Sequence, residues 1–252
     1  MYRYQHFSRE VMLDATTFRS HVGTLPQVPL VSTEEQVVFV RDLLCSGPLL
    51  IVCASITCPM ASAAAAPLRR LYRQHRTRVT FVTLYTREAH PGAHYTQPDT
   101  MQQKLEHARA YKERDRIPWL VAVDDLDGTV HRDIDLKPNA AYFLSAEGRI
   151  VFRVLWANDV AGLKRGFARL LSDRVSKPGS SETKILPMIC GLCFLERVLR
   201  AAGRGAPEDF QRTAPLAYAS GRLIGLCVSL PSLARTVLRA DRSRRWLERW
   251  MR

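Results

Sequence analysis

The strongest constraint on the fold is the apolar run at 49–54, Leu-Leu-Ile-Val-Cys-Ala, which Cys58-Pro59 follows after a short polar turn. A strand that is apolar on both faces is typical of a sheet covered by helices on both sides. Proline is favoured at the first helical position, because its missing N–H would have no partner there. Apolar residues then recur at helical spacing as far as Leu71. The pattern predicts a buried central strand that leads directly into a helix.

Further strands and helices alternate along the chain and end in a hairpin. We predict strands at 79–84 and 119–123, helices at 101–111 and 159–171, and hairpin strands at 140–144 and 149–155. A short strand or the start of a helix is expected at 37–40. This order predicts an α/β sandwich with a mixed central sheet.

The charge is distributed unevenly over the 252 residues, whose formal net charge is +13. Residues 1–173 hold 22 basic and 18 acidic side chains, whereas residues 174–252 hold 15 basic and 6 acidic ones. The segment 176–181, Ser-Lys-Pro-Gly-Ser-Ser, has the composition of a linker. We therefore expect an α/β domain over 1–173, a linker over 174–184 and a basic helical tail over 185–252.

Neither a membrane span nor a secreted disulfide scaffold is predicted. Residues 43–68 carry no charge, but Gly47-Pro48, Pro59 and Pro67 interrupt them, so a buried strand and a packed helix explain the segment. The six cysteines lack the spacing of a disulfide framework, and no secretory signal is visible at the start. A reducing, cytoplasmic location is expected.

Cys58 is the candidate nucleophile because it lies where the predicted strand meets the predicted helix. The unpaired amides of a helix's first turn carry partial positive charge, which favours thiolate over thiol. Ser55 and Thr57 would add hydroxyl donors to the sulfur, and both are expected in the substrate pocket. Cys53 falls within the apolar strand and is interpreted as a small core residue.

These residues resemble the thioredoxin superfamily, in particular its redoxin and peroxiredoxin branch. A closer resemblance is to the iodothyronine deiodinases, whose active-site sequence is Ser-Cys-Thr-Sec-Pro. Residues 55–59 read Ser-Ile-Thr-Cys-Pro, with Cys58 at the selenocysteine position. The strand at 81–86 is followed by Arg87 and by the family's Glu-Ala-His triplet at 88–90, and the hairpin at 142–152 also agrees. The resemblance covers about residues 25–172 and does not include the tail.

The resemblance implies a thioredoxin-like three-layer sandwich and a thiol-dependent oxidoreductase without a cofactor. Cys58 would attack a small or protein-borne electrophile, and external thiols would then reduce the enzyme. Cysteine is a weaker nucleophile than selenocysteine, and Ile56 replaces the family's other cysteine, so deiodination itself is not expected. Pro138 resembles the superfamily's cis-proline, which packs against the reactive sulfur.

Glu88 and His90 follow the strand beside that of Cys58, at the sheet edge where ligands gather. His90 would supply a proton to the leaving group or raise the thiolate fraction of Cys58, and Glu88 would orient it. A surface histidine and a solvated carboxylate are the alternatives. His94 is a further candidate for the pocket, although a surface position in the loop without a function is the favoured interpretation.

Two other groups of residues have a chemical and a structural interpretation. Cys190 and Cys193 have the spacing of a redox pair and are candidate resolving thiols, but a structural helix face is the default. The run Asp124, Asp125 and Asp127 has the composition of a cation site without the required spacing, so no metal site is predicted.

The basic tail has two candidate partners, a protein surface and an anionic membrane surface, because its end from Arg242 to Trp250 is basic and aromatic. Docking on a protein or on the α/β domain itself is ranked first. No nucleic-acid-binding module is recognised. The alternative to an enzyme is therefore a thioredoxin-fold binding or scaffold protein that acts through its tail.

Overall fold

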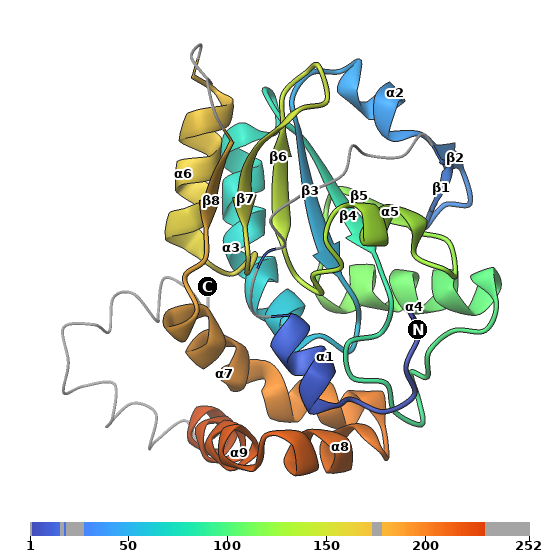
Figure 1. Ribbon diagram of the computed structural model, residues 1–252, viewed down its shortest axis with the longest axis vertical. Helices are drawn as coiled ribbons and strands as arrows, with labels where there is room; N and C mark the ends of the chain where they lie inside the picture. The colour runs from blue at the N-terminus through green and yellow to red at the C-terminus, as the bar shows by residue number, and fades with distance from the viewer. Residues whose placement is uncertain (1, 16–17, 19–27, 173–177, 230–252) are drawn as a thin grey trace.

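The structure is a computed structural model that describes residues 2–15, 18, 28–172 and 178–229. Its strands in the described part form one sheet in the order β2-β1-β5-β4-β3-β6-β7-β8 (Figure 1). Their bounds are β1 Leu30–Ser32, β2 Val37–Val38, β3 Leu49–Ala54, β4 Thr80–Tyr85, β5 Leu120–Val123, β6 Ala141–Leu144, β7 Ile150–Val154 and β8 Gly179–Ser181.

The apolar run at 49–54 is β3, and all six of its residues are buried. It pairs in parallel with β4 and antiparallel with β6, while β4 pairs in parallel with β5. β6 and β7 form the predicted hairpin. The order of β3, the following helix, β4, the hairpin and a closing helix is that of the thioredoxin fold, which confirms the predicted fold class.

Helices cover both faces of the sheet. Their bounds are α1 Arg9–Asp14, α2 Val40–Leu44, α3 Pro59–His75, α4 Met101–Arg114, α5 Thr129–Asp133, α6 Val160–Leu170, α7 Ile185–Ala202, α8 Ala206–Thr213 and α9 Pro215–Ser229. One core packs α3, α4 and α6 against the sheet, and a second core on the opposite face includes residues of α2 and α5. The sheet is therefore the middle of three layers.

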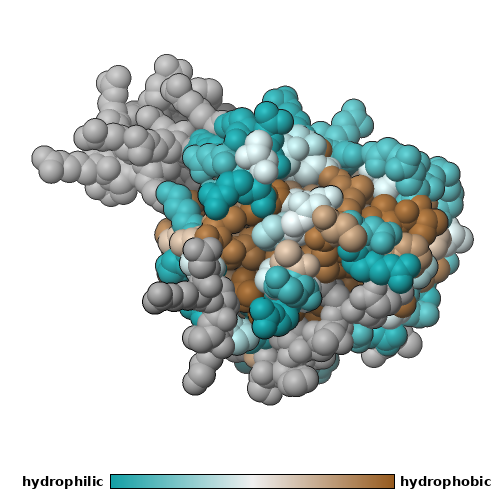
Figure 2. All heavy atoms as spheres, turned by 90° about the horizontal axis from the view of Figure 1, so that it is seen from above, coloured by the Kyte–Doolittle hydropathy of each residue, from teal (hydrophilic) through white to brown (hydrophobic). Residues whose placement is uncertain are grey.

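The alternation of side chains along β3 separates the two cores. Leu50 and Val52 belong to the core beneath α3, whereas Leu49, Ile51 and Cys53 belong to the core on the other face. Cys53 is a buried core residue, as its place in the apolar run predicts. At the end of the molecule where β3 begins, Figure 2 shows hydrophobic side chains surrounded by hydrophilic ones.

The C-terminal helices lie at the opposite end of the molecule, where β3 ends and α3 begins (Figure 1). A Cβ atom added to Gly191 of α7 would lie 2.3 Å from Sδ of Met60, so α7 packs closely on the first turn of α3. Within the segment expected to be a linker, β8 pairs in parallel with β7. The last part of the predicted helical tail, residues 230–252 with the basic end from Arg242 to Trp250, lies outside the described residues.

The N-terminal segment packs against the same C-terminal helices. The hydroxyl of Thr213 donates to the carbonyl of Phe7 at 3.1 Å, and His6 pairs with Asp209 at 2.9 Å. No residue of α1 is itself buried, although α1 lies beside α7 and α8 (Figure 1). The described helices include none that is long and apolar enough to span a bilayer.

Candidate active site

Cys58 is the N-cap residue of α3, at the strand-to-helix junction that the sequence predicts. The backbone N–H groups of Ala61 and Met60 lower its pKa, as expected at a helix start, although its side chain makes no capping hydrogen bond. Burial acts in the opposite direction and is the larger effect, since Cys58 is only 2% exposed. Burial raises the pKa of Cys58 to about 11. The prediction of a thiolate-favouring site is therefore wrong for this state of the protein, in which Cys58 is a neutral thiol at pH 7.

Cys58 lines a cavity of about 180 Å³. His90 and Pro138 line the same cavity, so three of the predicted site residues come together there. The other walls come from the N-terminal segment, from the chain after β7 and from α7 to α9, and they include Phe7, Trp156, Leu192 and Phe210. Segments from both ends of the chain thus enclose the candidate nucleophile.

His90 is buried between aromatic rings of the two terminal segments. Its ring centroid lies 4.2 Å from that of Phe7 and 5.2 Å from that of Phe210. Burial lowers the pKa of His90 to about 3, so its imidazole is neutral at pH 7. Its Nδ1 atom has no hydrogen-bond partner among the described residues. His90 is therefore a buried residue of the cavity wall and not a surface histidine.

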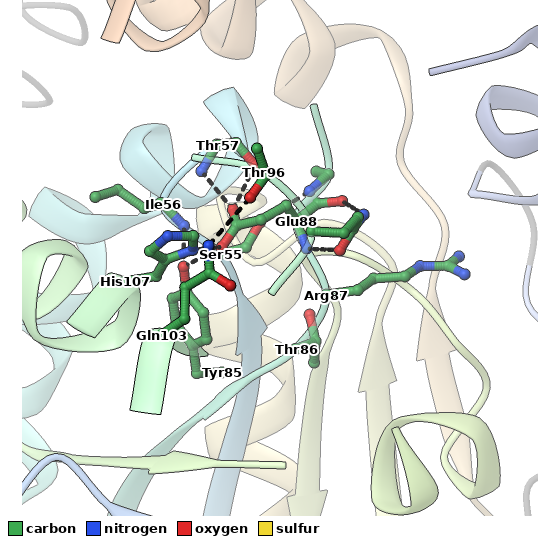
Figure 3. Close-up of polar contacts among 12 residues, drawn as sticks. Ser55, Ile56, Thr57, Tyr85, Thr86, Arg87, Glu88, Thr96, Gln103 and His107 are labelled. Atoms are coloured by element: carbon green, nitrogen blue, oxygen red, sulfur yellow. Dashed lines mark hydrogen bonds and ion pairs between the residues drawn. The ribbon is translucent and has the colours of Figure 1, made fainter. Parts of the chain in front are cut away.

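Glu88 is fully buried and is the centre of a hydrogen-bond network (Figure 3). Its carboxylate accepts from the hydroxyl of Thr57 at 2.6 Å and from the hydroxyl of Tyr85 at 2.5 Å. The backbone N–H of Thr57 and the ring of His107 also contact it, at 3.3 and 3.1 Å. These partners come from the turn after β3, from the end of β4 and from α4. These contacts satisfy the polar atoms of a carboxyl group that has no access to water.

The network connects Glu88 to His90 through Thr57 and not through the imidazole. The hydroxyl of Thr57 donates to Glu88 and accepts from the backbone N–H of His90 at 3.2 Å. Ser55 makes a parallel link, because its hydroxyl accepts from the backbone N–H of Ala89 at 3.2 Å. Thr57 and Ser55 thus hold the loop after β4 against the Cys58 turn, and neither is among the residues that line the cavity.

Arg114 holds the Cys58 turn from the other side. Its guanidinium donates to the carbonyl of Ile56 at 2.7 Å and to the hydroxyl of Ser62 at 2.8 Å. It also pairs with Asp115 at 2.8 Å. Its positive charge lowers the pKa of Cys58, although less than burial raises it. Arg114 of α4 therefore holds the chain on both sides of Cys58, at Ile56 and at Ser62.

His94 and Pro138 also differ from the expectation. His94 is exposed, and its backbone N–H donates to the carbonyl of Ala202 at 2.8 Å, at the C-terminal end of α7. It is not among the residues that line the cavity. The described chain contains no cis peptide bond, so the bond before Pro138 is trans, in contrast to the superfamily's cis-proline.

Cys190 and Cys193 lie on α7, and both are free thiols. Cys190 is buried against Ala63 of α3, and burial raises its pKa to about 11. Burial also raises the pKa of Cys193, whose sulfur points toward the carbonyl of Ile189 within the helix, at 3.7 Å. These contacts give the pair a structural role, and a resolving role stays a prediction.

The acidic turn after β5 stabilises a helix start. Both carboxylate oxygens of Asp124 accept backbone N–H groups at 2.8 to 3.2 Å, from Asp125, Val130 and His131. Asp125 accepts from the backbone N–H of Thr129 at 3.0 Å. Within the described residues, no three His, Cys, Asp or Glu side chains form a group that could hold a metal ion.

Sequence reasoning did not identify several residues of the site. Tyr85 could have been found, because it ends the same strand that leads to Glu88. His107 and Arg114 lie on a helix whose pattern carries no functional signal. Tyr4 and Phe7 are far from Cys58 in the sequence, and only the fold brings them to the cavity.

No family model matches this chain, and no curated protein matches it. Solved structures with a similar fold include a secreted disulfide oxidoreductase from Mycobacterium tuberculosis that is homologous to E. coli DsbE. It is 18% identical, with 49% of this chain and 80% of that chain covered and a TM-score of 0.39. A thioredoxin-like protein from Aeropyrum pernix is 15% identical over 56% of this chain and 88% of that chain, with a TM-score of 0.45. Peroxidoxin BcpB from Mycobacterium tuberculosis is 16% identical over 61% of this chain and 99% of that chain, with a TM-score of 0.44. At these identities the similarity is one of fold.

Proposed function

We propose that this protein is a thiol-dependent oxidoreductase, a deiodinase-like redoxin in which Cys58 is the redox nucleophile. The single observation that carries the proposal is the position of Cys58 as the N-cap residue of α3, where it lines a cavity together with His90. A sulfur beside helix-start amides is stabilised as it becomes a thiolate during attack.

The proposed reaction is a two-electron reduction of an electrophile R–X. The Cys58 sulfur attacks X, the R–X bond breaks, and R leaves with the thiol proton as R–H. An external thiol R′–SH then attacks the Cys58 sulfur, which releases H–X and forms a mixed disulfide. A second R′–SH attacks that disulfide, so that Cys58 returns to the thiol and R′–S–S–R′ leaves.

His90 and Glu88 have different roles in this proposal. His90 lines the cavity with Cys58 and is neutral, so it would relay the thiol proton to the leaving group. Glu88 is a positioning residue, because its contacts run to Thr57, Tyr85 and His107. Because Cys58 is only 2% exposed, a small electrophile is favoured over a protein-borne one.

The high pKa of Cys58 assigns a second role to the cavity walls. Burial is the largest cause of that pKa, so uncovering the cavity would rehydrate the sulfur and lower it. We therefore propose that the reactive form is one in which the N-terminal segment has moved away from Phe210. The enzyme would work in a reducing, cytoplasmic compartment with thiols as electron donors.

The test is steady-state consumption of hydrogen peroxide, as a general electrophile, with dithiothreitol as the external thiol. The wild-type protein is expected to consume peroxide faster than the buffer does. Cys58→Ser should abolish this activity, and Cys45→Ser, at an exposed cysteine, should preserve it. His90→Ala should slow the reaction, and an unchanged rate would remove His90 from the mechanism.

The burial of Cys58 favours a second candidate, a thioredoxin-fold binding or scaffold protein without turnover. In that case the contacts would be made by 185–252, with a protein or an anionic membrane surface as the partner. Ile185, Leu186, Met188 and Ile189 at the start of α7 are exposed apolar residues that would contribute. Alkylation of Cys58 by iodoacetamide separates the two candidates. A Cys58 that reacts only after denaturation, at every pH at which the fold persists, would favour the scaffold.

A further inference from the structure

The cavity that contains Cys58 is rich in aromatic rings. Five of its lining residues carry one: Tyr4, Phe7, His90, Trp156 and Phe210. The ring of His90 meets those of Phe7 and Phe210 edge to face, with interplanar angles of 62° and 65°. Edge-to-face and offset contacts are the arrangements in which aromatic rings attract one another. Such a wall favours a planar aromatic ligand over an aliphatic one.

Methionine side chains form another part of the lining. Met12, Met60 and Met188 come from α1, α3 and α7. Methionine is flexible and makes favourable contacts between its sulfur and aromatic rings, so it adapts to the outline of a ligand. Together, these residues make a surface that is apolar and adjustable.

The two charged residues in the lining already have partners within the protein. The guanidinium of Arg87 lies 4.9 Å from the ring centroid of Tyr4 and 5.1 Å from that of Tyr2. Asp14 lies 3.8 Å from Nζ of Lys137, which also donates to its carbonyl at 2.6 Å. A charged ligand would lose its hydration and would compete with these contacts for the charged groups of the lining. The lining selects an uncharged molecule.

The volume of the cavity suits one ring. An apolar cavity of about 150 Å³ is large enough to bind benzene. The cavity of about 180 Å³ therefore accommodates one ring with small substituents. An iodothyronine has two rings, bulky iodine atoms and a charged amino-acid group, so it is larger than this volume and more polar than the lining.

We propose that this cavity binds an uncharged molecule built around a single aromatic ring, and that this is the substrate class of the Cys58 site. The binding follows from the aromatic lining, the charged groups that already have partners and the volume. Its designation as substrate rests on the proposed function. The site thus differs from a deiodinase site in the size and the charge of the molecule that it takes.

The test uses 4-fluorotoluene as the probe and records its ¹⁹F resonance with the full-length protein. Ala217 of α9 lines the cavity, and Ala217→Phe is expected to fill it. Ala219 is exposed on the same helix, so Ala219→Phe is the matched control. Binding of 4-fluorotoluene should weaken at least tenfold in Ala217→Phe and stay within twofold of wild type in Ala219→Phe.

Two further ligands test the charge and the size that the cavity accepts. These measurements use the wild-type protein, so they do not depend on whether the variants fold. The charged analogue 4-fluorobenzoate should bind at least tenfold more weakly than 4-fluorotoluene, and thyroxine should not displace 4-fluorotoluene. Equal binding of the charged analogue, displacement by thyroxine, or undiminished binding to Ala217→Phe would overturn the proposal.

Protection of Cys58 connects the ligand to the sulfur. Saturating 4-fluorotoluene is expected to slow alkylation of Cys58 by N-ethylmaleimide at least threefold, and an unchanged rate would remove this ligand from the Cys58 site. Binding and protection in a protein that never consumes peroxide would keep the aromatic site and reject the redox function. Turnover without any binding of 4-fluorotoluene would keep the redox function and reject the aromatic site.

Discussion

The hydroxyl of Thr57, the residue before the candidate nucleophile Cys58, lies 2.6 Å from the carboxylate of Glu88. The same hydroxyl accepts the backbone N–H of His90 at 3.2 Å. One buried oxygen atom therefore links the Cys58 turn, the carboxylate and the chain at His90. This arrangement fixes Cys58 and His90 relative to each other without a direct contact between Glu88 and the imidazole.

We predict that removal of this hydroxyl destabilises the fold. Thr57→Val keeps the shape of the side chain but removes its hydrogen bonds to Glu88 and to the N–H of His90, which is expected to cost about 1–3 kcal/mol in the free energy of unfolding. Thr57→Ser keeps the hydroxyl and should cost about 1 kcal/mol at most, since only a methyl group is lost. Urea unfolding of the two variants measures the difference. Equal stabilities would show that the hydroxyl does not connect the two segments.

The reactivity of Cys58 should depend steeply on pH. Burial raises the pKa of Cys58 to about 11, so the thiolate fraction at pH 7 is about one in ten thousand. The rate of alkylation by iodoacetamide is expected to rise about tenfold per pH unit between about pH 7 and pH 10, as the thiolate fraction rises. Peptide mapping by mass spectrometry follows Cys58 separately from the exposed Cys45. A plateau below about pH 8 would contradict the raised pKa.

The N-terminal cover should control that pKa. Phe7 stacks on Phe210 with a centroid distance of 5.7 Å and lines the cavity. Phe7→Ala would admit water, lower the pKa of Cys58 and increase its alkylation rate at pH 8 about threefold or more, since half a pKa unit triples the thiolate fraction. Phe39→Ala, at the N-cap of α2, is the matched control for the loss of a ring. The same increase in both variants would show general loosening and not uncovering of the site.

The sequence was sufficient to predict the central part of the fold. The six-residue apolar run identified β3, and Pro59 at the first position of α3 located Cys58 at the helix start. Short elements such as β8 and α5 were not predicted, because three to five residues do not show a periodicity. Local patterns therefore defined the sheet but not everything attached to it.

The electrostatic state of the site could not be predicted from the sequence. Local rules place Cys58 beside helix-start amides, which lower its pKa, and this part of the prediction holds. The burial that outweighs the amides comes from Phe7 and from α7, which are distant in the sequence. The walls of a cavity are a property of tertiary packing, and no local motif encodes them.

Stability should fall in mild acid because of two buried histidines. Burial lowers the pKa of His90 and of His131 to about 3, below an ordinary value of about 6.5. Between these two values the unfolded state binds more protons, so stability is present above about pH 6.5 and is lost as the pH falls. For His131, burial is the largest cause of the lowered pKa, and the positive charge of Arg87 acts in the same direction. The carbonyl of Lys137, 3.0 Å from Nε2, raises the pKa but does not outweigh burial.

The expected loss from these two groups is up to about 4 kcal/mol in the free energy of unfolding between pH 7 and pH 5, or about 2 kcal/mol for each histidine. Urea unfolding at the two pH values measures it. His90→Asn should remove about half of the loss, whereas His94→Asn, at an exposed histidine, should leave the loss unchanged. A pH dependence that is the same in all three proteins would reject the buried, neutral state of His90.

The most direct test of the redox proposal is to trap the oxidised form of Cys58. The folded protein is treated with hydrogen peroxide in the presence of dimedone, which reacts with sulfenic acids, and the modified peptides are identified by mass spectrometry. If Cys58 is the redox nucleophile, dimedone is expected on Cys58, more of it in Phe7→Ala, and none when dithiothreitol is added before dimedone. Dimedone that is absent from Cys58 in the folded protein, at every pH from 7 to 9, but present after unfolding in urea would contradict the account.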